Sequence, residues 1–298
     1  MRTYLALSRS THGVIDIAMP GFAALLWLGR FPAWDVLAVA LVTALAGYTA
    51  IYALNDLVGV EVDREKFAGS GPNAGYSVEA SDLRYPIARG KLGFGRGLAW
   101  FSVWYLIALA GAWWLNPWLL VVVLAAPILE IVYCLLFKVT WWRVVVSGVV
   151  KSLGAIAAVL VVVPEPSLPW LGLMTAWIMA WEIGGQNVPA DWNDVEEDRR
   201  VGARTIPLVF GPRVAGTVVL VSLVVTVALS LCLPVMSPLD LGLAYRLAAF
   251  AAGFFLLLVP GYRLFRSHDG RRAARLFDRA SLYPLAMLVI ITVFVLLA

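Results

Sequence analysis

Long runs of apolar residues, interrupted by shorter polar segments, make up most of this sequence. A helix needs about 20 apolar residues to cross about 30 Å of hydrocarbon, and nine runs approach that length. Helices satisfy their backbone hydrogen bonds internally, so each of them can cross a bilayer. We therefore expect an all-α, polytopic membrane protein with about nine transmembrane helices. The predicted spans are residues 13–31, 34–56, 96–114, 117–137, 143–164, 169–190, 212–234, 242–263 and 281–298.

The composition argues against a soluble protein. Hydrophobic residues make up 61% of the chain and charged residues only 14%, with a mean hydropathy of +0.85. Soluble domains carry about 25% charged residues. The formal charge of +4 does not indicate nucleic-acid binding, because the charged residues lie in loops between apolar runs. Cys134 and Cys232 both lie inside predicted spans, which argues against a disulfide or a cysteine metal site.

Most of the 23 lysine and arginine residues fall on one side of the predicted spans. Basic residues accumulate on the cytosolic side, so we expect the N-terminus inside and the C-terminus outside. The longest cytosolic loops, about 57–95 and 191–211, hold most of the acidic residues. Because long loops are often functional, we expect one domain over 1–298 whose central cavity opens to the cytosol. The short loops and the lack of a transit peptide favour the inner membrane of a prokaryote.

The first of these loops begins with an asparagine–aspartate pair. If the helix of span 34–56 continues past the membrane edge, Asp56 and Asp63 face one direction, because each residue turns a helix by about 100°. Asn55 lies beside them, and Glu61 points away. The pattern therefore predicts a group of oxygen-bearing side chains at this helix end.

The second loop contains three aspartates with helical spacing. Asp191, Asp194 and Asp198 follow one stripe, at i, i+3 and i+7. Their mutual repulsion is best offset by a hard divalent cation with oxygen ligands. Both motifs end spans on the cytosolic side, so they can converge on one cavity and hold Mg²⁺ against a diphosphate leaving group. For either motif alone, the alternative is a solvated acidic helix end with salt bridges to residues such as Arg64 and Arg199.

Four charged residues lie inside the predicted spans, where charges are rare and usually functional: Asp16, Glu130, Lys151 and Glu182. Lys151 is expected to bind diphosphate oxygens, to extend its charged end toward the membrane surface, or to pair with Glu130 or Glu182. Asp16 and Glu182 are expected either to line the cavity or to hydrogen-bond between helices. Among the aromatic residues, most of which suit interfacial anchoring or core packing, cavity candidates for contact with an allylic carbocation are Tyr52 and Tyr133.

The two motifs resemble the signatures of the UbiA superfamily of intramembrane prenyltransferases, N-D-x-x-D-x-x-x-D and D-x-x-D-x-x-x-D. The resemblance covers nearly the whole chain. It extends to residues 8–12, to 86–90, to Tyr133 with Lys138 and Thr140, and to 202–211. The sequence departs from the family at Gly59, where an aspartate is expected, and at Tyr85, which replaces an arginine before Pro86.

This resemblance implies a magnesium-dependent active site. The implied catalytic residues are Asp56, Asp63, Asp191, Asp194 and Asp198. The implied metal-binding residues are Asn55, Asp63, Asp191, Asp194 and Asp198. The residues expected to bind the diphosphate are Arg9, Asn55, Arg64, Lys138 and Lys151.

The implied activity is transfer of a prenyl group from a polyprenyl diphosphate to a lipophilic acceptor within the bilayer, most plausibly an aromatic quinone precursor. The alternative is a terpene cyclase of the same superfamily, which Gly59 favours. A secondary transporter would carry its acidic residues deep in the spans. A regulatory protein with a decayed site would release no diphosphate. The sequence leaves open the acceptor, the chain length, the number of metal ions and the oligomeric state.

Overall fold

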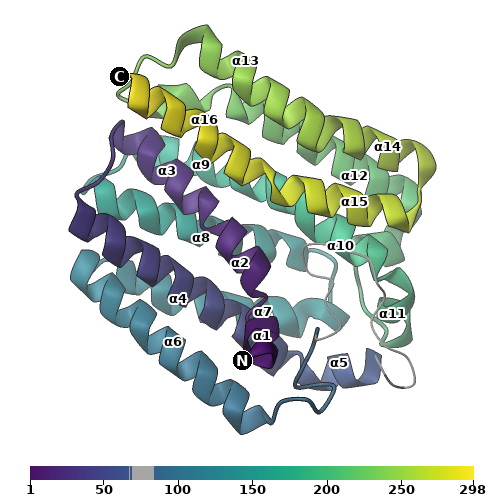
Figure 1. The fold of residues 1–298 in the computed structure, drawn as a ribbon. Helices are drawn as coiled ribbons and strands as arrows, with labels where there is room; N and C mark the ends of the chain where they lie inside the picture. The colour runs from purple at the N-terminus through teal and green to yellow at the C-terminus, as the bar shows by residue number, and fades with distance from the viewer. Residues whose placement is uncertain (67, 69–83) are drawn as a thin grey trace.

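The regular structure in the described part of the chain is helical. The computed structural model describes residues 1–66, 68 and 84–298, and no strand is present within these ranges (Figure 1). The predicted all-α fold class is therefore confirmed. The first half contains α1 (Arg2–Leu7), α2 (Ser10–Asp16), α3 (Ala18–Leu28), α4 (Trp34–Val58), α5 (Val60–Lys66), α6 (Phe94–Leu115), α7 (Leu119–Leu135), η1 (Leu136–Lys138) and α8 (Arg143–Val162). The second half contains α9 (Leu168–Trp181), η2 (Glu182–Asn187), α10 (Val188–Asn193), α11 (Val195–Arg200), α12 (Ile206–Ser230), η3 (Leu233–Met236), α13 (Gly242–Gly253), η4 (Phe254–Leu258), α14 (Val259–Ser267), α15 (Gly270–Ser281) and α16 (Tyr283–Leu297).

Eight helical units of the described chain are long and apolar enough to cross a membrane, and each matches one of the predicted spans. The ninth predicted span, 169–190, folds as α9, η2 and the start of α10, and is not among the eight. It is less apolar because it carries polar residues such as Glu182 and Gln186. The start of this helix is exposed at Leu168 and Trp170, but its later part is surrounded by protein, with Trp177 and Trp181 fully buried, so that part does not depend on a lipid-facing apolar surface.

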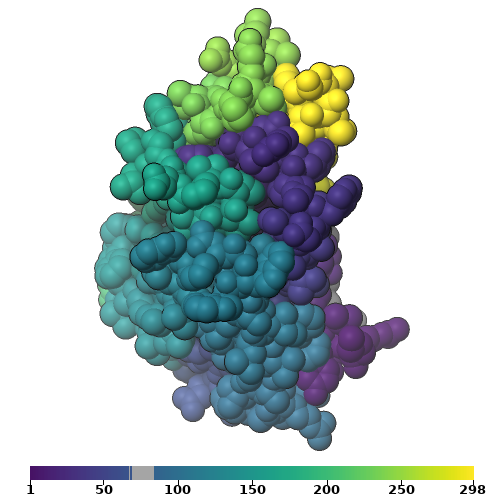
Figure 2. Space-filling model, turned by 90° about the vertical axis from the view of Figure 1, so that its left-hand side faces the viewer, coloured from purple at the N-terminus to yellow at the C-terminus, as the bar shows by residue number. Residues whose placement is uncertain are grey.

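The helices run side by side in a bundle with the two chain ends at opposite ends (Figure 1). α3 packs mainly on α8 and α16, whereas α4 packs mainly on α6 and α7. The largest hydrophobic core joins α3, α8, α9, α12 and α16. Figure 2 shows the end of the bundle at which the C-terminal residues of α16 lie, coloured yellow, close to the start of α4. The acidic motifs lie at the other end, near α5 and α11.

Large apolar side chains cover the outer surface of the bundle. Leu106 on α6, Val121 on α7 and Leu247 on α13 each expose at least 60% of their surface. Exposing this much apolar surface to water is unfavourable, whereas lipid accommodates it without cost. Together with the eight apolar helices, this surface identifies an integral membrane protein.

Candidate active site

The two aspartate motifs meet at one end of the bundle. α4 ends at Val58, and a turn at Gly59 leads into α5, which carries the first motif toward α11. The Lys66 side chain on α5 lies 2.6 Å (Nζ to Oδ1) from Asp198 on α11 and joins the two motifs directly. The rest of the loop predicted at 57–95 includes 69–83, which lies outside the described residues.

The first motif is held by a residue from the N-terminal segment. Arg9 donates to Asn55 Oδ1 at 3.2 Å, and its Nη2 lies 3.5 Å from Asp56 Oδ1. Asn55 in turn donates to Glu130 Oε1 at 2.6 Å. At Gly59 an added Cβ would lie 3.2 Å from Asp63 Oδ2. The Asp63 carboxylate therefore lies against the position where the family carries a further aspartate.

Each aspartate of the second motif is paired with a cation from another element. Asp191 lies 2.6 Å from Arg143 at the start of α8, and Asp194 lies 3.5 Å from Arg84. The third, Asp198, binds Lys66. All three aspartates are buried, although α10 ends at Asn193 and α11 begins at Val195, so that the predicted single stripe is interrupted at Asp194. We call Arg9, Asp56, Asp63, Lys66, Arg84, Arg143, Asp191, Asp194 and Asp198 the charged cluster.

Burial and mutual repulsion shift the protonation of these groups. The pKa of Asp63 is raised from 3.8 to about 7, first by burial and then by the negative charge of Asp56. The pKa of Asp191 is also raised to about 7, by burial against the opposing effect of Arg143, with Asp198 adding to the increase. Burial by itself would lower the pKa of Lys66, but Asp198 outweighs it and raises that pKa. A further positive charge in this cluster would return the carboxyl groups to the ionised form.

Two backbone positions beside the charged cluster are unusual. Arg9 (φ 43°) and Tyr85 (φ 55°) adopt left-handed conformations, which are rare for residues other than glycine. Arg84 donates to the Tyr85 hydroxyl at 2.7 Å, and the guanidinium of Arg9 lies 6.0 Å from the centre of the Tyr85 ring. Strained residues of this kind collect at functional sites, where the surroundings hold them in place.

The donor set of the charged cluster fits Mg²⁺, although the described residues contain no group of three or more His, Cys, Asp or Glu side chains that would by itself hold a metal ion. Mg²⁺ is usually bound by one or two carboxylates, several water molecules and the phosphate oxygens of a substrate, rather than by a cage of protein ligands. The buried carboxylates of Asp191, Asp194 and Asp198 and the half-buried carboxylate of Asp63 supply the hard oxygen ligands that this mode of binding requires. A metal ion held by these carboxylates would leave the cations that pair with them, Lys66, Arg84 and Arg143, without their carboxylate partners.

Three cations of the charged cluster were not predicted from the sequence: Lys66, Arg84 and Arg143. The prediction placed Arg64 at this position, but α5 turns Arg64 to the exposed surface and buries Lys66. A clue was present, since Lys66 follows Asp63 at i+3 and so shares its helix face. Lys138, also predicted to bind diphosphate, lies away from the charged cluster in a half-exposed pair with Glu65 at 2.6 Å.

A central cavity of about 720 Å³ begins beside the charged cluster, whose Arg9 lines it, and extends into the bundle. A cavity was predicted, and its opening to the cytosol stays a prediction. Asn55, Tyr52 and Tyr133 line its polar end, and the Arg143 guanidinium lies 4.5 Å from the centre of the Tyr133 ring. The remaining wall is mostly apolar and is formed by α3, α4, α7, α8 and α16. Exposed apolar residues such as Val14 and Leu41 also line the cavity, so it reaches the lipid-facing surface.

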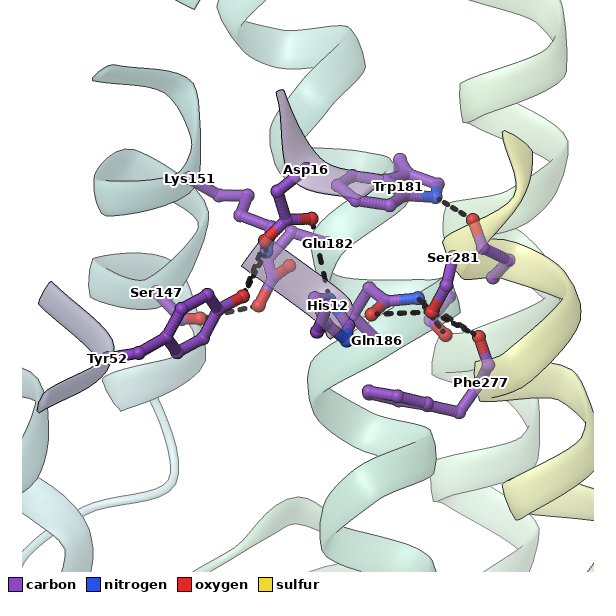
Figure 3. A network of polar contacts seen from close by, with 12 residues as sticks. His12, Asp16, Tyr52, Ser147, Lys151, Trp181, Glu182, Gln186, Phe277 and Ser281 are labelled. Carbon is purple, nitrogen blue, oxygen red and sulfur yellow. Dashed lines mark hydrogen bonds and ion pairs between the residues drawn. The ribbon is translucent and has the colours of Figure 1, made fainter. Parts of the chain in front are cut away.

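A second polar group lies deeper along the cavity wall (Figure 3). Lys151 lies 2.7 Å from Asp16, whose carboxylate also accepts from the Tyr52 hydroxyl and lies 3.4 Å from His12. Glu182 accepts from Ser147 at 2.7 Å. The sequence left pairing of Lys151 with Glu130 or Glu182 open, and the ion pair in the structure is with Asp16. We call His12, Asp16, Tyr52, Ser147, Lys151 and Glu182 the inner polar cluster.

Fold and site together define the class: a polytopic helical membrane protein with a charged cluster at the end of a mostly apolar cavity. Residues 17–291 match the model of the UbiA prenyltransferase family. The chain therefore belongs to this family. No curated protein sequence matches it.

Solved structures share the fold at low sequence identity. A UbiA homologue from Aeropyrum pernix K1 superposes with a TM-score of 0.74 at 16% identity, covering 96% of this chain and 97% of that one. A UbiA homologue from Archaeoglobus fulgidus bound to DMAPP and Mg²⁺ gives a TM-score of 0.70 at 16% identity, covering 98% and 99%. A structure described for digeranylgeranylglyceryl phosphate synthase gives 0.69 at 14% identity, covering 100% and 99%.

Proposed function

We propose that this protein transfers a prenyl group from a prenyl diphosphate to a lipophilic acceptor, with Mg²⁺ as cofactor. One observation carries the proposal: a group of buried carboxylates and cations is joined, through Arg9, Asn55 and Tyr133, to the polar end of a mostly apolar cavity. A prenyl diphosphate has the same division, with a metal-binding anionic head and a hydrocarbon tail. The structural relative from Archaeoglobus fulgidus binds DMAPP with Mg²⁺, and its structure with GPP and Mg²⁺ has a similar fold.

In this proposal the two charge types of the cluster separate when the substrate binds. Asp63 and the second-motif aspartates hold the metal ion, with Asn55 nearby. The diphosphate oxygens are bound by four cations: Arg9, Lys66, Arg84 and Arg143. The guanidinium of Arg143 also lies over the Tyr133 ring and helps to hold that ring in place. Mg²⁺ supplies charge neutralisation for the departing diphosphate. Preorganised positive charge of this kind stabilises a leaving group because it needs no rearrangement during the reaction.

The cavity accounts for the rest of the substrate. Its volume of about 720 Å³ lies within the range of small-molecule sites, which is about 300–1,000 Å³. The apolar wall excludes water from an allylic cation, and the rings of Tyr52 and Tyr133 offer cation–π contact near the polar end. The isoprenoid tail extends between the helices toward lipid, where Val14 and Leu41 are exposed.

We further propose that the charged cluster faces the cytosol. Arg199 and Arg200 end α11 at this end of the bundle, and the α14–α15 turn lies beside α10, with Gly270 close to the Trp192 carbonyl. Arg271 and Arg272 follow that turn. Because basic residues mark the cytosolic side, this arrangement supports an N-in orientation in an inner (cytoplasmic) membrane.

The experiment that tests the function uses purified protein in detergent, with Mg²⁺, geranyl or farnesyl diphosphate and an aromatic acceptor such as 1-naphthol. Wild-type protein is expected to release diphosphate. The rate of Asp198→Ala is expected to fall by at least about 10²-fold, because the variant removes a buried carboxylate proposed to hold the Mg²⁺ that neutralises the leaving diphosphate. Glu196→Ala on the same helix is the matched control, since Glu196 is 69% exposed. Equal rates for wild-type and Asp198→Ala, or no diphosphate release at all, would contradict the proposal.

A terpene cyclase is the second candidate, and the space at Gly59 favours it. Because residue 59 is glycine, the first motif offers one metal-binding carboxylate fewer than the family signature, and the Asp63 carboxylate lies against the vacant side-chain position. A cyclase forms its product from the diphosphate and Mg²⁺ alone. Mass spectrometry of products made with and without an aromatic acceptor separates the two activities.

A further inference from the structure

The helix that contains the second motif is distorted at one point inside the bundle. Between α9 and α10, residues Glu182–Asn187 form the π-helical segment η2. Such segments are rare and occur frequently at functional sites, because the extra residue turns side chains toward a new direction. In η2 the first and last residues, Glu182 and Asn187, both line the cavity.

Both of these side chains carry an oxygen atom without a hydrogen-bond partner among the described residues. Glu182 is 7% exposed, and its Oε2 has no partner, while Ser147 binds its other oxygen at 2.7 Å. Asn187 is 6% exposed, and its Oδ1 has no partner, while its amide nitrogen donates to the Tyr133 hydroxyl at 2.9 Å. Buried polar atoms are almost always paired, so two unpaired acceptors on one cavity wall point to a ligand that donates hydrogen bonds.

The surroundings restrict what this ligand can be. The unpaired atoms are a carboxylate oxygen and an amide oxygen, and both accept hydrogen bonds from O–H or N–H groups. The neighbouring cation Lys151 is held by Asp16 at 2.7 Å, which favours a neutral ligand over one with its own carboxylate. The rest of the cavity is mostly apolar. A lipophilic molecule with a hydroxyl group meets all of these conditions.

The position of η2 along the helix suits an acceptor. Asn187 precedes Asp191 by four residues, which is about 6 Å along a helix axis. Glu182 precedes Asp191 by nine residues, which is about 13 Å along the same axis. Tyr133 contacts both Asn187 and Arg143, so the segment is linked to the charged cluster. A molecule bound at η2 therefore lies between the diphosphate site and the apolar part of the cavity.

We propose that η2 binds the hydroxyl group of the prenyl acceptor, with Glu182 as the catalytic residue that takes up its proton. The proposal rests on the proposed transferase function. The C–O bond between the allylic carbon and the diphosphate breaks, and its electron pair leaves with the diphosphate. A new bond forms from the acceptor oxygen to the allylic carbon. Where a ring carbon conjugated with that oxygen forms the bond instead, this carbon then loses its own proton and the oxygen regains one, which restores the aromatic ring. The hydroxyl proton moves to Glu182 Oε2.

The test uses a matched pair of probes, 1-naphthol and its methyl ether 1-methoxynaphthalene, with geranyl diphosphate and Mg²⁺. Wild-type protein is expected to prenylate 1-naphthol and to leave the methyl ether unchanged. Glu182→Gln keeps the size of the side chain but cannot accept the proton, so transfer is expected to fall by about 10²-fold or more. Binding of geranyl diphosphate with Mg²⁺ to this variant is expected to stay within about twofold of wild-type.

A second pair of variants covers the case in which Glu182→Gln does not fold. Ser147→Ala removes the hydroxyl that holds Glu182 and is expected to slow transfer about tenfold, the effect of one lost hydrogen bond. Ser152→Ala on the same helix is the control, because Ser152 donates to the Gly148 carbonyl and does not line the cavity. Transfer at the wild-type rate in Glu182→Gln, equal slowing by both serine variants, or prenylation of the methyl ether would overturn the inference. Release of diphosphate without any naphthol product would also overturn it, whereas an absence of diphosphate release in wild-type protein contradicts the transferase function itself.

Discussion

The charged cluster and the inner polar cluster are both buried, yet they balance their charges in different ways. In the charged cluster each aspartate of the second motif has its own cation, and these cations come from separate elements. In the inner polar cluster one aspartate, Asp16, takes hydrogen bonds or ion-pair contacts from three side chains, and Glu182 Oε2 has no hydrogen-bond partner among the described residues.

This difference indicates two kinds of ligand. A set of separate ion pairs can exchange partners, so a metal ion with a diphosphate can replace the internal pairs one by one. The inner polar cluster, in which Asp16 and Lys151 already pair and Glu182 Oε2 can accept a hydrogen bond, is suited to a neutral donor, since a charged ligand would have to break the Asp16–Lys151 pair in a site of low polarity. The comparison leads to three predictions that start with the charged cluster.

The largest effect is expected from Lys66. Lys66→Met leaves Asp198 buried without its cation and removes a candidate phosphate ligand, so the rate with geranyl diphosphate is expected to fall by about 10²–10³-fold. Arg64→Met is expected to change the rate far less, because Arg64 is exposed on the opposite side of α5. Steady-state rates at several Mg²⁺ concentrations check this order. A larger loss in Arg64→Met would show that the sequence, rather than the structure, identified the right residue.

An intermediate effect on stability is expected in the inner polar cluster. Lys151→Met removes one partner of a buried ion pair and is expected to lower the free energy of unfolding by about 3–5 kcal/mol. The double variant Asp16→Asn with Lys151→Met is expected to recover part of this loss, because no unpaired charge remains. Thermal unfolding in detergent measures both. If Lys151→Met instead weakens diphosphate binding as strongly as Lys66→Met does, the separation of the two clusters is wrong.

The smallest effect is a pH dependence of metal binding. The pKa values of Asp63 and Asp191 are raised to about 7, so in the metal-free protein these groups carry protons at lower pH. A metal ion must displace these protons, and its affinity is therefore expected to rise with pH up to about 7, roughly tenfold per unit for each proton released, and to level off above. Calorimetric titration of Mg²⁺ with geranyl diphosphate between pH 6 and 8 measures it. An affinity that falls over this range would contradict the assignment of these carboxylates.

The fold could be predicted largely from the sequence because the bilayer imposes a simple rule. Each span needs a fixed length of apolar residues, and eight of the nine predicted spans are long, apolar helices in the structure. The span at 169–190 is an exception for a physical reason: its later part, from Trp177 onward, packs inside the bundle, so the surface of that part is not set by lipid. The Gly211–Pro212 dipeptide marks the kink in α12, and the predicted span began there, but the π-helical η2 has no length or composition signal.

The candidate site could be predicted only in part. Spacing within one helix identified the aspartates, and the structure brings Asp56, Asp63 and the second motif to one end of the bundle. The cations could not be identified in the same way, because Arg84 and Arg143 reach the aspartates from segments far apart in the chain. The roles of the predicted residues remain predictions, and those of Lys138 and Lys151 now have competing partners in Glu65 and Asp16.

The sequence by itself determined that this protein is a helical membrane protein of nearly uniform span length, with two aspartate motifs at one side of the membrane. These features depend on local rules: the thickness of the hydrocarbon layer, the turn of a helix and the distribution of basic residues. Only the tertiary structure decided which cation faces each aspartate and that Asp16, 135 residues away in the chain, pairs with Lys151. It also placed Glu182 and Asn187 so that each has an oxygen without a hydrogen-bond partner among the described residues. Such pairings depend on the packing of helices that are distant in the chain, and no local pattern in the sequence encodes them.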